Sequence, residues 1–171
     1  FGISYGMGAK TLAKRTEVSK EEAQMFIDNF LYEYSAINEF HKNLIAAARD
    51  KGYLTTLYGR RRYLKHINSN NNRLRSQAER FAKNFPIQGL GSDLIKIAMI
   101  KCYELIKDKP DEIKMILSIH DELVFEVRDD KAEEYREKIT EIMQSVLPKP
   151  YSDRVTLLVE AKIAETWADA H

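Results

Sequence analysis

Two apolar runs separated by three polar residues constrain the fold of this chain more than any other feature. IKMILSI (113–119) and LVFEV (123–127) are rich in β-branched and aromatic residues, and only His120-Asp121-Glu122 joins them. Runs of this composition are typical of strands, and so short a connection allows only an antiparallel pair. The sequence therefore predicts a β-hairpin whose apolar face is covered by helices.

Helical patterns are found on both sides of this hairpin. Ser19 and Glu22 form a capping-box pattern, and apolar residues then recur at steps of three and four as far as Leu44. We expect one amphipathic helix or two consecutive ones, ended by Lys51-Gly52. Further helices are expected over residues 73–84 with a stop at Pro86, from about 92 to 105, and after Asp129-Asp130.

Two more β segments complete the predicted architecture. A small basic hairpin is expected over residues 53–65, around Tyr58-Gly59, and a last strand over VTLLVEAKI (155–163). The fold class is therefore α+β, with helices packed on a small antiparallel sheet.

Composition limits the classes of function. The 171 residues contain a single cysteine, Cys102, which excludes an intrachain disulfide and a cysteine-rich zinc site. No apolar run approaches the length of a membrane span, so we expect no membrane partner and a cytoplasmic location. The net charge is only +1, but residues 42–83 contain 11 Lys/Arg against 2 Asp/Glu. Such a segment indicates either a polyanion-binding surface or an ordinary solvated face.

The polar connection His120-Asp121-Glu122 has two interpretations. None of its residues adopts a positive φ at low cost, and its adjacent carboxylates repel each other. A divalent cation such as Mg²⁺ would relieve that repulsion, although successive strand residues point to opposite faces and do not share one ligand role. Taken alone, the pattern favours a solvated acidic turn over a metal site.

The basic segment combines groups suited to nucleic acid. Arg60 and Arg61 are flanked by tyrosines, and guanidinium groups match phosphates while aromatic faces accept bases. Arg80 and Asn84 are four residues apart and so lie on one helix face. Arg75 and Gln88 add donors, although a salt-bridged surface helix would have a similar composition.

Five groups of residues, in order and with their spacing, resemble family A DNA polymerases, the bacterial DNA polymerase I group. They are FGISYG (1–6), GRRRYL (59–64), AERFAKNFPIQG (78–89) with DLIKIAM (93–99), IHDEL (119–123) and WADAH (167–171). The resemblance covers essentially the whole chain. It implies part of a right-hand polymerase, with the C-terminal part of the fingers at 1–50 and the palm at 51–171.

The resemblance also implies roles for single residues. Phe1 and Tyr5 match residues that contact the incoming nucleotide and the templating base. Asp121 matches one of two palm aspartates that hold the catalytic metals, with Glu122 beside it as a second catalytic candidate. The residues that match contacts to primer–template DNA, or that add basic groups beside them, are Arg60, Arg61, Arg75, Arg80, Asn84, Gln88 and His120.

The implied activity is Mg²⁺-dependent nucleotidyl transfer from a dNTP to a primer 3′-hydroxyl, in DNA replication or repair at the nucleoid. The family's second metal-binding aspartate and its triphosphate-binding Arg and Lys precede the matched segment. We therefore expect the chain to need an N-terminal part and to be inactive alone. The alternatives are a non-catalytic nucleic-acid-binding module and an accessory subunit of a split polymerase.

Overall fold

The predicted hairpin is present in the computed structural model, which describes residues 2–170. Strands β3 (Ile113–Ile119) and β4 (Glu122–Val127) pair antiparallel, with Ile113 opposite Val127 and Ile119 opposite Glu122. The register shifts between Met115 and Leu117 because of a bulge or irregularity. The chain divides into two compact units, residues 1–90 and 91–171, and the hairpin belongs to the second.

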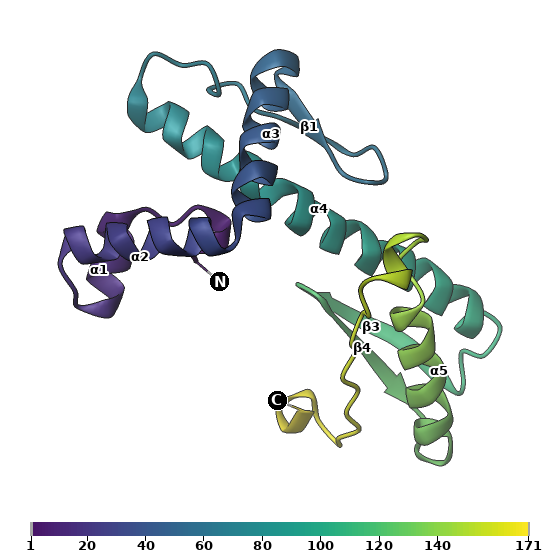
Figure 1. The fold of residues 1–171 in the computed structure, drawn as a ribbon. Coiled ribbons are helices and arrows are strands. Elements are labelled where there is room, and N and C mark those ends of the chain that lie inside the picture. Colours follow the sequence, from purple (N-terminus) through teal and green to yellow (C-terminus); the bar gives the residue numbers. More distant parts are fainter. Residues whose placement is uncertain (1, 171) are drawn as a thin grey trace. The chain divides into compact units, whose positions relative to one another are not determined.

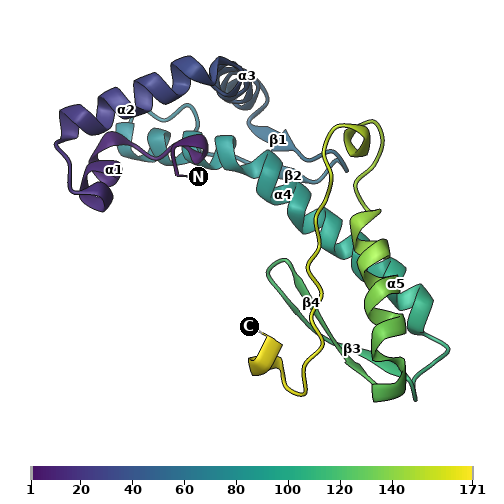
Figure 2. The ribbon, with the colours of Figure 1, turned by 60° about the horizontal axis from the view of Figure 1, so that its bottom comes forward.

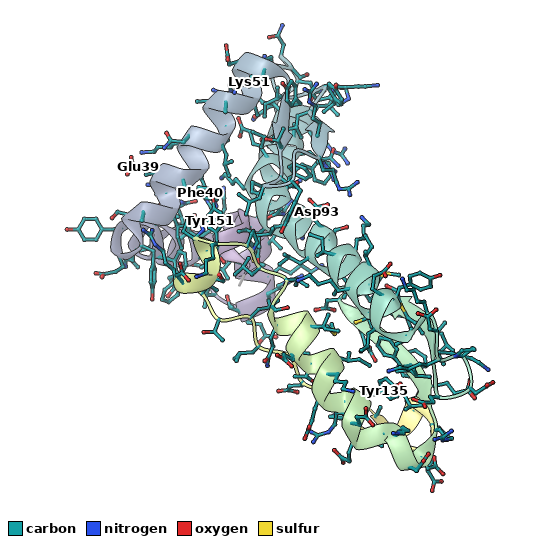
Figure 3. The ribbon with its side chains drawn as sticks, turned by 90° about the vertical axis from the view of Figure 1, so that its right-hand side faces the viewer. Glu39, Phe40, Lys51, Asp93, Tyr135 and Tyr151 are labelled. Atoms are coloured by element: carbon teal, nitrogen blue, oxygen red, sulfur yellow. The ribbon has the colours of Figure 1, made fainter. Side chains whose placement is uncertain are left out.

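Helices cover the hairpin as its apolar face requires. Helix α5 (Ala132–Gln144), preceded by the 3₁₀ turn η2 (Asp129–Lys131), lies beside β3 and β4 (Figure 1). Tyr135 projects from α5 and is fully buried (Figure 3). It belongs to a core cluster of buried residues that also contains Cys102, Ile106, Ile113 and Ile139.

The first unit begins with short helices. The 3₁₀ turn η1 (Ile3–Tyr5) is followed by α1 (Ala9–Thr16), α2 (Lys20–Glu33) and α3 (Ser35–Lys51). Of the two expected arrangements, one helix or two consecutive ones, the structure has the second, since Tyr34 leaves helical geometry between α2 and α3. In the capping box, Ser19 N donates to Glu22 (2.9 Å) and Glu22 N donates to Ser19 Oγ (3.1 Å). Gly52, in the left-handed region with φ 74°, ends α3 as predicted.

The basic hairpin is shorter than predicted. Strands β1 (Tyr53–Thr55) and β2 (Arg61–Tyr63) pair antiparallel beside α3 (Figure 2). This hairpin packs on α3 and on the first half of α4 (Asn72–Ile106). The buried residues of that core are Ala48, Leu54, Leu64, Ile67, Ala78, Ala82 and Phe85.

The prediction that Pro86 stops a helix was wrong. Helix α4 runs through Pro86 without a break, so residues 73–84 and 92–105 form one helix of 35 residues. Proline lacks the N–H that would donate to the Ala82 carbonyl, which disfavours a helix interior. Residues on both sides of Pro86 are buried: Phe85 before it and Leu94 and Ala98 after it. Their packing keeps the chain helical on both sides of the proline.

The predicted last strand, 155–163, was also wrong. This segment has no strand assignment, although its exposure alternates as in a strand: Leu157 and Val159 are half-buried, while Leu158 is 83% exposed. Alternation gives a segment one apolar side, but a strand also needs a neighbouring backbone with which to pair. The β3–β4 sheet has two strands within residues 2–170.

The α+β class is confirmed by helices and two small antiparallel sheets. No helix in the described part of the chain combines the length and apolar character needed to cross a membrane. The functional boundary between residues 50 and 51 stays a prediction.

Candidate functional site

The acidic tip of the second unit is a two-residue turn formed by His120 and Asp121. Because Ile119 pairs with Glu122, only these two residues connect the strands. His120 has φ 53°, in the left-handed region, and histidine is one of the non-glycine residues enriched there. A non-glycine residue in the left-handed region destabilises the folded state by about 1–2 kcal/mol, and in this turn that residue is His120. Asp121 is thereby left exposed at the tip.

Glu122 is held by a residue far away in sequence. The indole N–H of Trp167, in the 3₁₀ turn η4 (Trp167–Ala170), donates a 3.2 Å hydrogen bond to Glu122 Oε1. Glu122 is half-buried at the start of β4, whereas Asp121 is exposed. The two carboxylates therefore have different environments, and that they do not share one role stays a prediction. Sequence reasoning used Trp167 only as part of a terminal motif and missed this contact.

The donor chemistry at the tip suits Mg²⁺, since carboxylate oxygens are hard ligands. Asp121 is the residue that would hold the ion. Within residues 2–170, however, no three His, Cys, Asp or Glu side chains gather closely enough to form a metal cage. The tip therefore presents the exposed carboxylate of Asp121, and its role as a metal ligand stays a prediction.

The basic hairpin of the first unit carries aromatic rings and a guanidinium group that lie close together. Tyr53 and Tyr63 are cross-strand partners with ring centroids 5.6 Å apart. The guanidinium of Arg61 lies 4.8 Å from the Tyr53 ring centroid. Arg60 is in the turn, where its carbonyl accepts from Thr56 N at 3.0 Å. These contacts place Arg60 in the turn and Arg61 on β2 beside the half-buried Tyr53 ring, while Tyr63 is exposed.

The predicted residues of α4 share one helix face, because Arg80, Asn84 and Gln88 follow at steps of four. Arg80 and Gln88 are exposed. Asn84 is half-buried, and within the described residues its buried Oδ1 has no hydrogen-bond partner. A buried acceptor left unpaired costs about 1–3 kcal/mol, so this amide marks a place where an incoming donor would be favourable.

The structure brings the predicted nucleotide contact near this face. Tyr5 is the last residue of η1, and Gly6 follows it with φ 81°. A Cβ placed on Gly6 would lie 3.1 Å from Lys83 Cδ and 3.6 Å from Arg80 Cγ. The turn after η1 therefore packs directly against the side chains of Lys83 and Arg80 on α4. Phe1, the other predicted nucleotide contact, lies outside the described residues.

His41 is a further residue at this junction, and the sequence pattern did not single it out. It is buried in α3, and burial lowers its pKa, with the positive charge of Lys83 acting in the same direction. A hydrogen bond to the Ser4 backbone opposes that lowering of the pKa. His41 thus ties α3 to η1, the turn that positions Tyr5.

Arg75 has local partners. Its guanidinium donates to the Ser69 carbonyl (3.0 Å) and to Asn72 Oδ1 (3.2 Å), bracing the start of α4. Its contact with DNA stays a prediction, as do the roles of the other predicted site residues.

Comparison with known proteins identifies the family. Residues 1–169 match the family described as DNA polymerase family A. DNA polymerase I of Caldicellulosiruptor bescii is 39% identical over 169 residues, which cover 98% of this chain and 19% of that protein. DNA polymerase I of Pseudomonas aeruginosa is 38% identical over 171 residues, covering 100% of this chain and 18% of that protein.

A solved structure is similar in fold. It is the POL domain of Pol1 from M. smegmatis in complex with DNA primer–template and dNTP, with a TM-score of 0.79 and 37% identity. The match covers 86% of this chain and 26% of that chain, and this chain spans 19% and 18% of the two curated relatives above. The chain therefore belongs to DNA polymerase family A and corresponds to a segment of its polymerase domain.

Proposed function

We propose that this segment supplies one metal-binding carboxylate, Asp121, and a primer–template-binding face to a template-directed DNA polymerase. The observation that carries the proposal is the exposed Asp121 at the tip of the β3–β4 hairpin, in a chain that matches the polymerase family over residues 1–169. The relative solved with primer–template and dNTP supports DNA and a dNTP as partners.

The chemistry is nucleotidyl transfer to a primer 3′-hydroxyl. Mg²⁺ in such sites activates the attacking hydroxyl and neutralises charge on the phosphates. Asp121 would hold the ion, and its exposure leaves its oxygens accessible. Glu122, fixed by Trp167, positions the start of β4 and so the tip. His120 sits beside the primer terminus.

The first unit binds DNA. Arg60, Arg61 and Arg80 contact phosphates, which position a duplex without reading its sequence. Asn84 and Gln88 offer amide donors to the acceptors of the minor groove, which are similar for all base pairs and so test pair shape. Arg75 adds charge at the start of α4, and Tyr5, with Phe1, contacts the nascent pair. Residues 1–50 serve as fingers and 51–171 as palm, and the protein acts in the cytoplasm at the nucleoid.

We propose further that this chain alone does not polymerise, because one exposed carboxylate is half of a two-metal site. The test is primer extension with Mg²⁺ and dNTPs. The chain is assayed alone and together with the part of P. aeruginosa DNA polymerase I that precedes its matched segment. We expect extension only from the mixture, or from a chimera that joins the two in one chain.

Three outcomes separate the alternatives. Extension by the chain alone would overturn the proposed incompleteness. Extension by the unlinked mixture would favour a subunit of a split polymerase, whereas extension by the chimera alone favours one continuous enzyme. DNA binding with no extension from either would favour a non-catalytic binding module.

A further inference from the structure

The turn that carries Tyr5 depends on other elements for its position. Turn η1 (Ile3–Tyr5) has only three residues, and none of the three is buried. Its own hydrogen bonds are few: Tyr5 N donates to the Gly2 carbonyl at 3.2 Å, and Gly6 N donates to the Ile3 carbonyl at 2.9 Å. Turns of this kind are short and have poor hydrogen-bond geometry. Contacts with the rest of the first unit must therefore hold η1 in place.

Contacts with three parts of the first unit anchor this turn. Ile3 packs against a buried cluster from α1 and α2, which contains Ala9, Ala23 and Ile27. On the other side of Tyr5, Gly6 lies against Lys83 of α4. Between these two contacts, the Ser4 backbone is hydrogen-bonded to His41 of α3. Tyr5 thus follows directly after a residue that α3 holds.

The hydrogen bond from His41 acts on the peptide group that precedes Tyr5. This bond raises the pKa of His41, so it favours the protonated ring and the imidazole is its donor. The acceptor is therefore the Ser4 carbonyl, which belongs to the peptide group that joins Ser4 to Tyr5. A peptide group is planar, so fixing this carbonyl also fixes the direction of the Tyr5 N–H.

The surroundings of His41 favour its neutral form. His41 is only 6% exposed, and both this burial and the positive charge of Lys83 lower its pKa. Residues 2–8 contain no charged side chain that could stabilise a proton on the ring. The ionisable groups on the neighbouring stretches of these elements are Tyr5 of η1, Arg80 and Lys83 of α4, Glu33 of α2, and Glu39 and Lys42 of α3. Glu33, Glu39 and Lys42 are exposed to solvent.

We propose that His41 is a positioning residue for the nascent base pair: its imidazole N–H holds the Ser4 carbonyl and thereby sets where Tyr5 meets the pair. The proposal rests on the proposed function, since Tyr5 has this role only in a polymerase. It adds a residue of α3 that contacts neither DNA nor nucleotide to those that set the affinity for dNTP.

Docking of η1 should consequently weaken in acid. A proton on His41 would place a second positive charge in a buried site near Lys83. The docked state therefore binds this proton less readily than a state in which η1 has moved away. Docking is complete above the ordinary histidine pKa of 6.5 and weakens as the pH falls below it.

Four variants test the role of the imidazole. His41→Leu removes the donor and keeps an apolar side chain of similar size. His41→Asn and His41→Gln each keep an amide donor, close to the positions of Nδ1 and Nε2 respectively, and neither can be charged. Asn43→Leu is the matched control, because Asn43 is exposed and lies two residues further along α3, away from the face of His41.

The first measurement is amide hydrogen exchange of Tyr5 and Gly6 in the 171-residue chain, expressed as protection factors at pH 7.5 and 5.5. At pH 7.5, His41→Leu should lower protection by about 5-fold, as expected for the loss of one hydrogen bond. His41→Asn or His41→Gln should restore protection, and Asn43→Leu should leave it unchanged. Protection should fall from pH 7.5 to 5.5 in the wild type but not in the two amide variants.

The second measurement is single-nucleotide insertion by chimeras that carry this segment in P. aeruginosa DNA polymerase I. His41→Leu should raise the KM for dNTP by about 5-fold or more, since a misplacement of 1 Å at a reacting centre can cost about 100-fold. Primer–template affinity should stay unchanged. A variant that is only less stable would contain less active enzyme, which lowers the apparent kcat and leaves KM unchanged. Rescue of KM by His41→Asn or His41→Gln would support the proposal.

The other outcomes separate this proposal from the proposed function. Exchange of Tyr5 and Gly6 that is insensitive to His41→Leu would overturn the positioning role, even where the wild-type chimera extends primers. Faster exchange with an unchanged KM would also overturn it, because the hydrogen bond would then serve stability alone. An acid response that persists in the two amide variants would overturn the assignment of that response to His41. A wild-type chimera that does not extend primers would overturn the proposed function, and with it the role of His41 at the nascent pair.

Discussion

Trp167 and Glu122 are joined by a hydrogen bond of 3.2 Å although they are 45 residues apart in sequence. The bond connects the last described turn of the chain with the first residue of β4. It thereby links the C-terminal segment to the hairpin whose tip carries Asp121.

Replacing Trp167 by Phe should loosen this link at small cost to stability. The bond is exposed, so its loss should lower the free energy of unfolding by about 1 kcal/mol at most, measured by urea denaturation. Amide hydrogen exchange over residues 167–170 should become faster. Tyr151→Phe, at another exposed aromatic residue of the same unit, is the control. Unchanged exchange in Trp167→Phe would show that the bond does not hold the segment.

Asp121→Ala should abolish catalysis in a chimera that carries this segment in P. aeruginosa DNA polymerase I. Loss of a metal ligand removes several kcal/mol of transition-state stabilisation, so primer extension should fall by about 1,000-fold or more. Primer–template affinity should be largely kept. Asp111→Ala, at an exposed loop position of the same unit, should extend normally. Weak DNA binding with normal turnover would show that Asp121 contributes to DNA binding and not to catalysis.

Arg80→Gln should weaken primer–template binding and make it less sensitive to salt. Each phosphate contact contributes about 0.9 to the slope of log K against log salt concentration, so losing one should reduce that slope by about 0.9. Titrations at several NaCl concentrations measure it, with Arg15→Gln on α1 as the control. An unchanged slope would remove Arg80 from the DNA face.

Tyr135 should make the stability of the second unit sensitive to alkali. Burial, with the 2.6 Å hydrogen bond that its hydroxyl donates to Glu112, raises the Tyr135 pKa to about 12 from the usual 10. The folded state therefore keeps a proton that the unfolded state loses. The contribution of the protonated Tyr135 hydroxyl to the free energy of unfolding is complete below pH 10 and is lost as the pH rises toward 12.

The measurement is urea unfolding at pH 8, 10 and 11 of the wild type and Tyr135→Phe. At pH 8 the variant should be less stable by about 1–3 kcal/mol, because Glu112 loses its donor. Above pH 10 its stability should fall less than that of the wild type. Tyr103→Phe, at an exposed position of α4, should follow the wild type, and a parallel decline in Tyr135→Phe would refute the assignment.

Local sequence patterns correctly predicted the elements that short-range interactions along the chain stabilise. Ser19 and Glu22 satisfy each other's backbone groups within one helical turn, so the start of α2 was readable from four residues. Gly52 at the end of α3 and the antiparallel pairing of β3 with β4 follow from equally short-range chemistry. The two apolar runs placed Asp121 in the connection between these strands, and the structure has it at the hairpin tip.

Predictions that depended on distant packing were wrong or were never made. Pro86 disfavours a helix locally, yet α4 continues because buried residues on both sides keep it in place. Residues 156–162 alternate in exposure as a strand does, but pairing needs a second backbone.

The sequence by itself determined the family, the α+β class, the hairpin and the basic character of residues 42–83, since composition, spacing and short-range hydrogen bonding determine these. Only the tertiary structure decided that Trp167 holds Glu122, that His41 ties η1 to α3, and that Arg62 lies at the Phe81 ring. The physical reason is that these contacts join residues on separate elements, and packing free energy, unlike turn or helix propensity, has no short-range signature in the chain.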